Sequence, residues 1–231
     1  MCAGPRGWWA TTASLAAAGQ AGIADRIRLP APASAVATGE ESMWALTRQP
    51  TPALWRIDPS SNRVVGGPTP LPADPWSLGV GAGAVWVADH AGWLVKIDPR
   101  TLKVVARQRL DVGPHGVVAT RDGVYVADAH GSRLLEAGPG TAMTRRVTGL
   151  PVGPIYPAAG AGSIWSGSAA VWSNATAHDD RVVRIDPATL AVTQTFHLGG
   201  NVSTVAFGFG SLWATVNPAS WSASPRPARL A

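Results

Sequence analysis

The stretch GAVWVADHAGWLVKIDP, residues 83–99, decides the fold. It holds two short apolar segments, one centred on Trp86 and one ending at Ile97, with a glycine-containing turn between them. Segments this short, bounded by glycine and Asp-Pro, are typical of β-strands and too short for helices. The side chain of Asp98 is expected to bond nearby backbone N–H groups, and Pro99 presets φ. The stretch therefore predicts two strands followed by a tight turn.

The end of this stretch recurs along the chain. The copies are LWRIDP at 54–59, LVKIDP at 94–99 and VVRIDP at 182–187, with a degenerate copy, LLEAGP, at 134–139. The isoleucines of the intact copies are 40 and 88 residues apart, and the second interval equals two periods of 44. A period of about forty residues indicates a repeat architecture.

A glycine-rich turn followed by a short strand with a central aromatic residue recurs with the same period. The aromatic residues, called anchors here, are Trp9, Trp44, Trp86, Tyr125, Trp165 and Trp213. Their spacings are 35, 42, 39, 40 and 48 residues. A unit of about forty residues with four short strands is the signature of a β-propeller blade. A β-sandwich is the rival fold, but it does not require one motif to recur every forty residues. We expect each anchor to wedge between adjacent sheets.

The predicted fold is all-β, a β-propeller of four-stranded blades with about four complete blades and partial blades at both termini, open or incomplete. The expected strands of the clearest blade are 78–80, 84–88, 93–97 and 104–110. One propeller domain is expected over 1–217, with a partial blade at 4–30, blades at 33–74, 75–113, 114–153 and 154–201, a partial blade at 202–217, and a disordered tail at 218–231.

Composition agrees with this fold and narrows the classes of function. Charged residues make up 14% of the chain, where about 25% is usual, and the chain has 26 Gly and 20 Pro. These values exclude a coiled coil, a helical bundle and a highly charged disordered chain. The net charge of +5 comes almost wholly from arginines, which are scattered along the chain with only Arg145 and Arg146 adjacent. This scatter argues against nucleic acid as a partner.

Targeting signals leave the compartment open. Cys2 is the only cysteine, so an internal disulfide cannot form. No segment reaches the roughly 18 uninterrupted apolar residues of a membrane helix. The N-terminal residues only loosely mimic a signal peptide, so secreted and cytoplasmic locations both remain open, as does the oligomeric state.

Several polar and aromatic side chains are expected at one rim of the propeller. The loops between blades and the loops joining second and third strands open on the same face. Trp76 and His115 each follow a proline eleven residues before an anchor, in what we expect to be an inter-blade loop. Second strands are expected to end at Asp89 and Asp128, each followed closely by a histidine. The candidate ligand-binding residues are Trp76, Asp89, His90, His130, Tyr156, Trp172 and His178.

The longest anchor spacing, 48, predicts an insertion over 168–180 that enters the same face. It carries Trp172, His178, Asp179 and Asp180. Two histidines and two aspartates near one opening could hold a divalent cation, but a tight ligand spacing such as His-x-x-x-His is absent. The sequence therefore leaves a metal site open.

The segments VGPHGVV at 112–118, GVYVAD at 123–128 and RIDPATL at 184–190 resemble the virginiamycin B lyase-like (streptogramin lyase) propellers and their NHL and YVTN relatives. The resemblance implies a lyase that opens a lactone ring by elimination. It also implies His115 as catalytic base and Asp128 as its catalytic partner or a metal ligand, alongside a bound magnesium ion. The same blade consensus serves lyases, binding modules and extracellular scaffolds.

Three functions follow from the sequence. The first is a binding or interaction module that uses the loop-rich rim of the channel to hold a small molecule or a protein. The second is a streptogramin lyase-like C–O lyase. The third is an incomplete propeller without autonomous activity, because the chain is expected to enter and leave at second strands.

Overall fold

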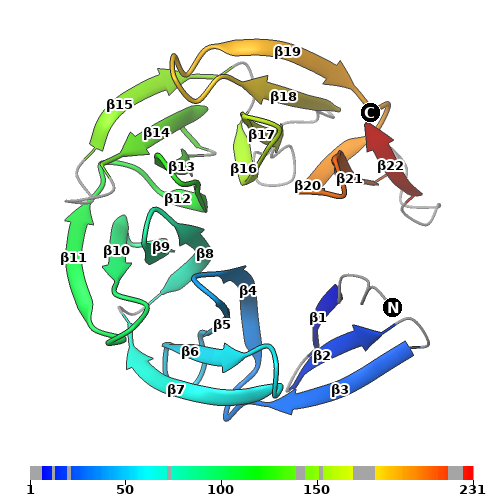
Figure 1. The fold of residues 1–231 in the computed structure, drawn as a ribbon. Helices are drawn as coiled ribbons and strands as arrows, with labels where there is room; N and C mark the ends of the chain where they lie inside the picture. The colour runs from blue at the N-terminus through cyan, green and yellow to red at the C-terminus, as the bar shows by residue number, and fades with distance from the viewer. Residues whose placement is uncertain are drawn as a thin grey trace.

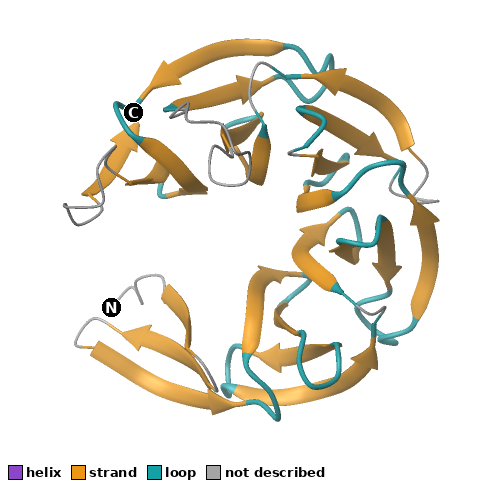
Figure 2. Cartoon of the chain, turned by 180° about the vertical axis from the view of Figure 1, so that it is seen from behind, coloured by secondary structure: helices purple, strands orange, loops and turns teal. Residues whose placement is uncertain are grey.

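The computed structural model describes residues 7–11, 14–19, 22–71, 74–128, 130–138, 144–150, 153–168, 180–217 and 226–230. In these ranges the regular elements are twenty-two β-strands in six sheets, and Figure 2 shows the strands joined by loops. No helix in the described ranges is long and apolar enough to cross a membrane. The all-β prediction is confirmed.

The strands pair in chain order within each sheet. The first sheet contains β1 (Gly7–Thr11), β2 (Ser14–Gly19) and β3 (Gly22–Arg28). The second contains β4 (Ala33–Gly39), β5 (Ser42–Thr47), β6 (Ala53–Asp58) and β7 (Arg63–Pro70). The third contains β8 (Pro75–Gly81), β9 (Ala84–Asp89), β10 (Trp93–Ile97) and β11 (Val104–Arg109). The fourth contains β12 (Pro114–Ala119), β13 (Val124–Asp128), β14 (Arg133–Ala137) and β15 (Thr144–Gly149). The fifth contains β16 (Pro154–Gly160), β17 (Ser163–Ser168), β18 (Arg181–Ile185) and β19 (Val192–His197). The sixth contains β20 (Asn201–Gly208), β21 (Ser211–Asn217) and β22 (Arg226–Leu230).

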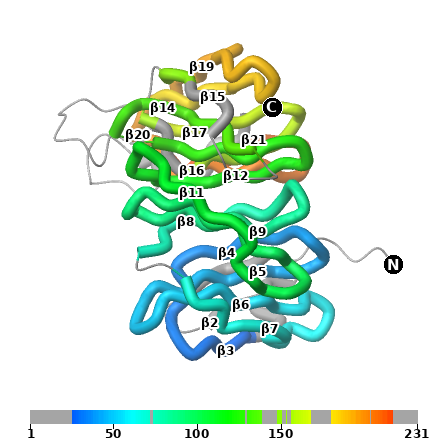
Figure 3. Tube along the Cα trace, turned by 90° about the vertical axis from the view of Figure 1, so that its left-hand side faces the viewer, coloured from blue at the N-terminus to red at the C-terminus, as the bar shows by residue number. Residues whose placement is uncertain are grey.

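The sheets are arranged radially around a central axis. In Figure 1, β4, β8, β12 and β16 line the inside of the arc, and β7, β11, β15 and β19 form its outside. Viewed from the side, the second, third and fourth sheets follow one another upward in chain order (Figure 3). The first and last sheets lie at the two ends of the arc (Figure 1). This arrangement is that of a β-propeller, as the forty-residue repeat predicts.

One expectation about the C-terminal residues is wrong. Residues 226–230, which fall in the segment expected to be disordered, form β22 and pair antiparallel with β21. Pro227 concealed this strand in the sequence. Proline lacks the backbone N–H that would donate a hydrogen bond to a neighbouring strand. An edge strand such as β22 tolerates this loss because it pairs with a neighbouring strand on one side only.

Three of the anchors, Trp44, Trp86 and Trp165, pack between neighbouring sheets, as predicted. Trp44 of β5 lies in one buried cluster with Leu78 of β8, and Trp86 of β9 lies in another with Val117 of β12. Both indoles are fully buried. Trp165 of β17 packs in the same way against the sixth sheet. Each of these three tryptophans therefore joins its own blade to the next one.

Each buried tryptophan is also tied to its own blade. The indole Nε1–H of Trp86 donates a hydrogen bond of 3.0 Å to the carbonyl of Gly81, and the ammonium of Lys96 lies 5.5 Å from the ring centroid. The same two contacts recur at Trp44 and at Trp165. The cation comes from the paired third strand, which explains why Lys or Arg precedes Ile-Asp-Pro in each intact copy.

The Asp-Pro turn forms by the predicted mechanism. Oδ1 of Asp98 accepts hydrogen bonds from the backbone N–H groups of Arg100 and Thr101, at 2.9 and 2.7 Å. The Thr101 bonds are the largest cause of a lowered pKa at Asp98. The turn prediction is confirmed.

Candidate functional site

The innermost strands carry a recurring irregularity near their start. The pairing of β8 with β9 jumps from Pro75 to Ser77, so Trp76 stands outside the regular ladder. The pairing of β12 with β13 skips His115 in the same way. These residues therefore lie in strands and not in inter-blade loops, which corrects the expectation from sequence. A β-bulge of this kind turns a side chain away from its normal direction and is frequent beside functional sites.

A continuous column of side chains crosses three sheets at one rim. The guanidinium carbon of Arg48 lies 4.3 Å from the ring centroid of Trp76, which stacks on His90 at 4.0 Å and 22°. His90 lies 5.2 Å from His115, and His115 meets His130 edge-on at 4.8 Å and 77°. We call these five residues the rim column. The structure thus brings together four residues selected from sequence and adds Arg48, which sequence reasoning missed.

The rim column borders a cavity of about 360 Å³, the rim cavity, lined by Trp76, His90, Gly113, His115 and His130. His115 is buried, and its Nδ1 lies 2.8 Å from the carbonyl oxygen of Gly113. A carbonyl can only accept, so Nδ1 carries the hydrogen. Nε2 is then the ring nitrogen left for a ligand.

The two aspartates expected at the rim hold turns. Oδ2 of Asp128 accepts a hydrogen bond of 2.7 Å from Nη2 of Arg133, and its Oδ1 accepts one of 3.1 Å from the N–H of Gly131. Oδ2 of Asp89 accepts a hydrogen bond of 3.1 Å from the N–H of Asp74. Both carboxylates are buried at strand ends. Their oxygens are engaged by the protein itself.

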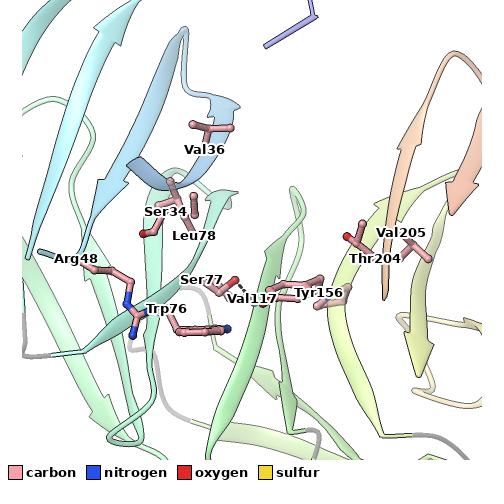
Figure 4. Close-up of a pocket in the computed structure, with 12 residues that line it drawn as sticks. Ser34, Val36, Arg48, Trp76, Ser77, Leu78, Val117, Tyr156, Thr204 and Val205 are labelled. Carbon is pink, nitrogen blue, oxygen red and sulfur yellow. Dashed lines mark hydrogen bonds between the residues drawn. The ribbon is translucent and has the colours of Figure 1, made fainter. Parts of the chain in front are cut away.

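A second cavity, of about 430 Å³, lies along the innermost strands, and we call it the channel cavity. Its lining includes Arg48, Trp76, Ser77, Tyr156 and Thr204. Figure 4 shows Arg48 and Trp76 on one side of this cavity and Thr204 on the opposite side. Tyr156 has a φ of 41°, in the left-handed region that an aromatic residue seldom adopts. Such strain concentrates at functional sites. Trp76 lines both cavities, so they adjoin.

Two other candidates, Trp172 and His178, lie outside the described residues, as does most of the predicted insertion. Within the described ranges, no three His, Cys, Asp or Glu side chains are placed to hold a metal ion. The described residues therefore do not fit the magnesium ion that the resemblance implies.

The electrostatic setting of His90 follows from its place in the column. Burial lowers the pKa of His90, and the nearby His115 lowers it further. The carboxylate of Asp74, whose Oδ2 is 3.5 Å from Nδ1, opposes the shift, Arg48 adds to it, and Asp89 opposes it. A lowered pKa keeps this imidazole neutral near pH 7.

We expect the stability of the protein to fall as the pH is lowered below about 6.5. The unfolded chain then binds a proton at residue 90 that the folded protein resists, so the free energy of unfolding declines as the pH falls toward the folded pKa of His90. Melting temperatures at about pH 7.5, 6.5 and 5.5 measure this decline. The variant His90→Gln should flatten it. An unchanged slope in that variant would assign the decline to other groups.

The comparisons with known proteins place the fold. No protein family and no curated protein matches the sequence. Among solved structures, BBS1N in complex with ARL6DN is 14% identical over 91% of this chain and 70% of its own, with a TM-score of 0.68. The Neurospora crassa Pan2 WD40 domain is 10% identical over 90% and 68%, also with a TM-score of 0.68. Kuenenia stuttgartiensis hydrazine synthase is 14% identical over 76% of this chain, with a TM-score of 0.63.

This chain spans about half of the hydrazine synthase chain that it matches, 53%. At these identities the likeness establishes the fold, a β-propeller of the kind seen in WD40 domains.

Proposed function

We propose that the protein is a β-propeller binding module that holds a small molecule in the rim cavity. The observation that carries the proposal is the column of Trp76, His90, His115 and His130 around a cavity of about 360 Å³. A concave site with aromatic walls and a few polar atoms is the usual form of a ligand site. Rigid strands hold Trp76 and His115, which favours a preformed site.

The rings offer a ligand both apolar contact and polar atoms. His115 has one ring nitrogen held by Gly113 and the other available. The Nε2 atom of His90 is buried and has no hydrogen-bond partner among the described residues. A planar ligand with a hydrogen-bond donor would satisfy such an acceptor. One similar structure, BBS1N, is in complex with ARL6DN, which agrees with a binding role at the level of fold.

Replacing His115 by Ala should weaken binding at the rim cavity by at least about tenfold, because the ligand loses a ring wall and a polar partner. A fragment library screened by ligand-observed NMR supplies the probes, and titration calorimetry supplies the affinities. His197→Ala is the matched control, because His197 lies on β19 and bonds Asp180. Fragments that bind both variants equally, or an absence of binding fragments, would contradict the proposal.

A lyase of the streptogramin type is the second candidate. It is favoured by one observation, the orientation of His115, whose bond to Gly113 leaves Nε2 as a general base beside a cavity. The carboxylate of Asp128 is held by Arg133, so the base would act without that partner. An elimination assay on a cyclic ester, compared between the native protein and His115→Ala, tests it. Equal rates in the two proteins would exclude this role.

A further inference from the structure

Two buried N–H donors beside the channel cavity have no acceptor in the described part of the chain. They are Nε of Arg48 and Nε1 of Trp76, and both side chains line that cavity. Buried donors in folded proteins nearly always have an acceptor, which the chain, water or a ligand supplies. The Nε1–H groups of five other indoles donate to acceptors in the chain: Trp44, Trp55, Trp86, Trp165 and Trp213. Trp76 departs from that pattern.

The two donors belong to a stacked pair. The guanidinium carbon of Arg48 lies 4.3 Å from the indole centroid of Trp76, and the two residues lie side by side in Figure 4. N–H bonds of a guanidinium and of an indole lie in the planes of the rings, so they project from the edges of the stack. The hydrogen bonds described for Arg48 go to Asp74 through Nη2. Its Nε–H has no acceptor among the described residues.

The charge of the cavity favours an anion. Among the described lining residues, Arg48 is the only one charged at neutral pH, and none is a carboxylate. Its partner Asp74 lies outside the lining. Arginine recognises carboxylates through two parallel N–H bonds, which a planar acid can accept. Tyr156, held in a strained conformation, also lines the cavity and can pack against a ring.

A cationic ligand fits less well. Attraction of a cation to an aromatic residue requires a free ring face. Arg48 and His90 already lie against the indole of Trp76, at 4.3 and 4.0 Å from its centroid. Trp76 and Arg48 therefore present to the cavity the positive edge of the indole and a guanidinium, and both repel a cation.

We infer that the channel cavity binds a small planar acid, whose carboxylate accepts hydrogen bonds from Arg48 and Trp76 and whose ring packs against Tyr156. This site is separate from the rim cavity and shares only Trp76 and the adjoining wall with it. A volume of about 430 Å³ is within the range of small-molecule sites.

Three probes with the same ring, similar size and different charge test the inference: 2-naphthoate, 2-naphthamide and 2-naphthylmethylamine. Calorimetric titration at neutral pH should show binding of the acid, at least about tenfold weaker binding of the amide, and no binding of the ammonium. In NMR spectra, the acid should shift the indole N–H resonance of Trp76. Trp76→Phe identifies that resonance.

Variants of Arg48 separate recognition from folding. Arg48→Lys keeps the positive charge that faces Asp74 but loses the planar guanidinium with its two parallel N–H donors. This variant should weaken naphthoate binding by about tenfold. Arg48→Gln should abolish measurable binding. Arg63→Gln, an exposed residue at the start of β7, should have no effect. His197→Ala, on β19, should also leave naphthoate binding unchanged. The rim-cavity proposal is tested by the fragment library and His115→Ala, so its failure is distinguishable from failure of this one. Preferred binding of the ammonium, binding insensitive to Arg48, or no binding of naphthoate would each overturn the inference.

Discussion

Replacing Trp86 by Ala should lower the free energy of unfolding by about 3–5 kcal/mol. The indole is fully buried between the third and fourth sheets, and its Nε1–H donates to the carbonyl of Gly81. Truncation removes the apolar contacts of the ring, opens a cavity between two blades and leaves that carbonyl without its donor. Domains have about 5–15 kcal/mol of stability in all, so the variant should be close to unfolding. Chemical denaturation followed by circular dichroism measures the loss.

Trp213→Ala is the matched control for this result. Trp213 occupies the equivalent anchor position and makes the same bond, to the carbonyl of Gly208 at 3.1 Å, but it is 38% exposed. Its removal should cost clearly less, because less apolar surface returns to water. Equal losses in the two variants would show that the indole hydrogen bond, and not burial between sheets, is what stabilises each blade.

Replacing Gly116 by Ala should destabilise the protein by about 1–3 kcal/mol. A methyl group at this position would lie 2.5 Å from Cδ of Pro157 and 2.8 Å from the backbone nitrogen of Tyr156. A proline ring and a backbone atom cannot rotate away, so β12 and β16 must separate. Gly116 follows His115 in the chain and lies against Tyr156, so the separation of β12 and β16 should also change the shape of both cavities. Ligand binding in the rim cavity and in the channel cavity should therefore become weaker.

Gly149→Ala is the control, because a methyl group there meets no atom within 4 Å. Its effect on stability should stay within about 0.5 kcal/mol. The melting temperature of each variant and its affinity for naphthoate are the two measurements that check the prediction. A Gly116→Ala protein with native stability and native affinity would mean that the two innermost strands adjust freely, contrary to a rigid channel wall.

Much of the fold was predictable because its causes are local and repeated. The apolar anchor strand and the Asp98 turn each need only neighbouring residues to form. The anchor strand recurs in each sheet, and the Asp-Pro turn recurs in the three intact copies. The strands predicted for the third sheet agree with β8 to β11 within a few residues. Strand β22 was missed because its pairing with β21 depends on a partner across the sheet and because Pro227 interrupts the strand pattern.

The site was predictable only in part. Trp76, His90, His115 and His130 could be selected because propeller geometry places equivalent loops and strand ends on one face. Their stacking could not, since it depends on bulges in β8 and β12 that set where the side chains point.

The sequence by itself determined that this chain is a β-propeller. Each blade needs an aromatic residue that packs between sheets, and this requirement produces a motif that repeats along the sequence. Only the tertiary structure decided what the rim and the channel present. Arg48 follows β5 in one sheet, yet it lies over Trp76 of the next, and it leaves no periodic signal. Asp128, for which the resemblance implies a catalytic role, is engaged by the N–H of Gly131 and by Arg133. Asp89, expected as a ligand-binding residue, is engaged by the N–H of Asp74. Such contacts occur only once in the chain and depend on strand register and on packing between residues distant in sequence. A local sequence pattern therefore cannot predict them.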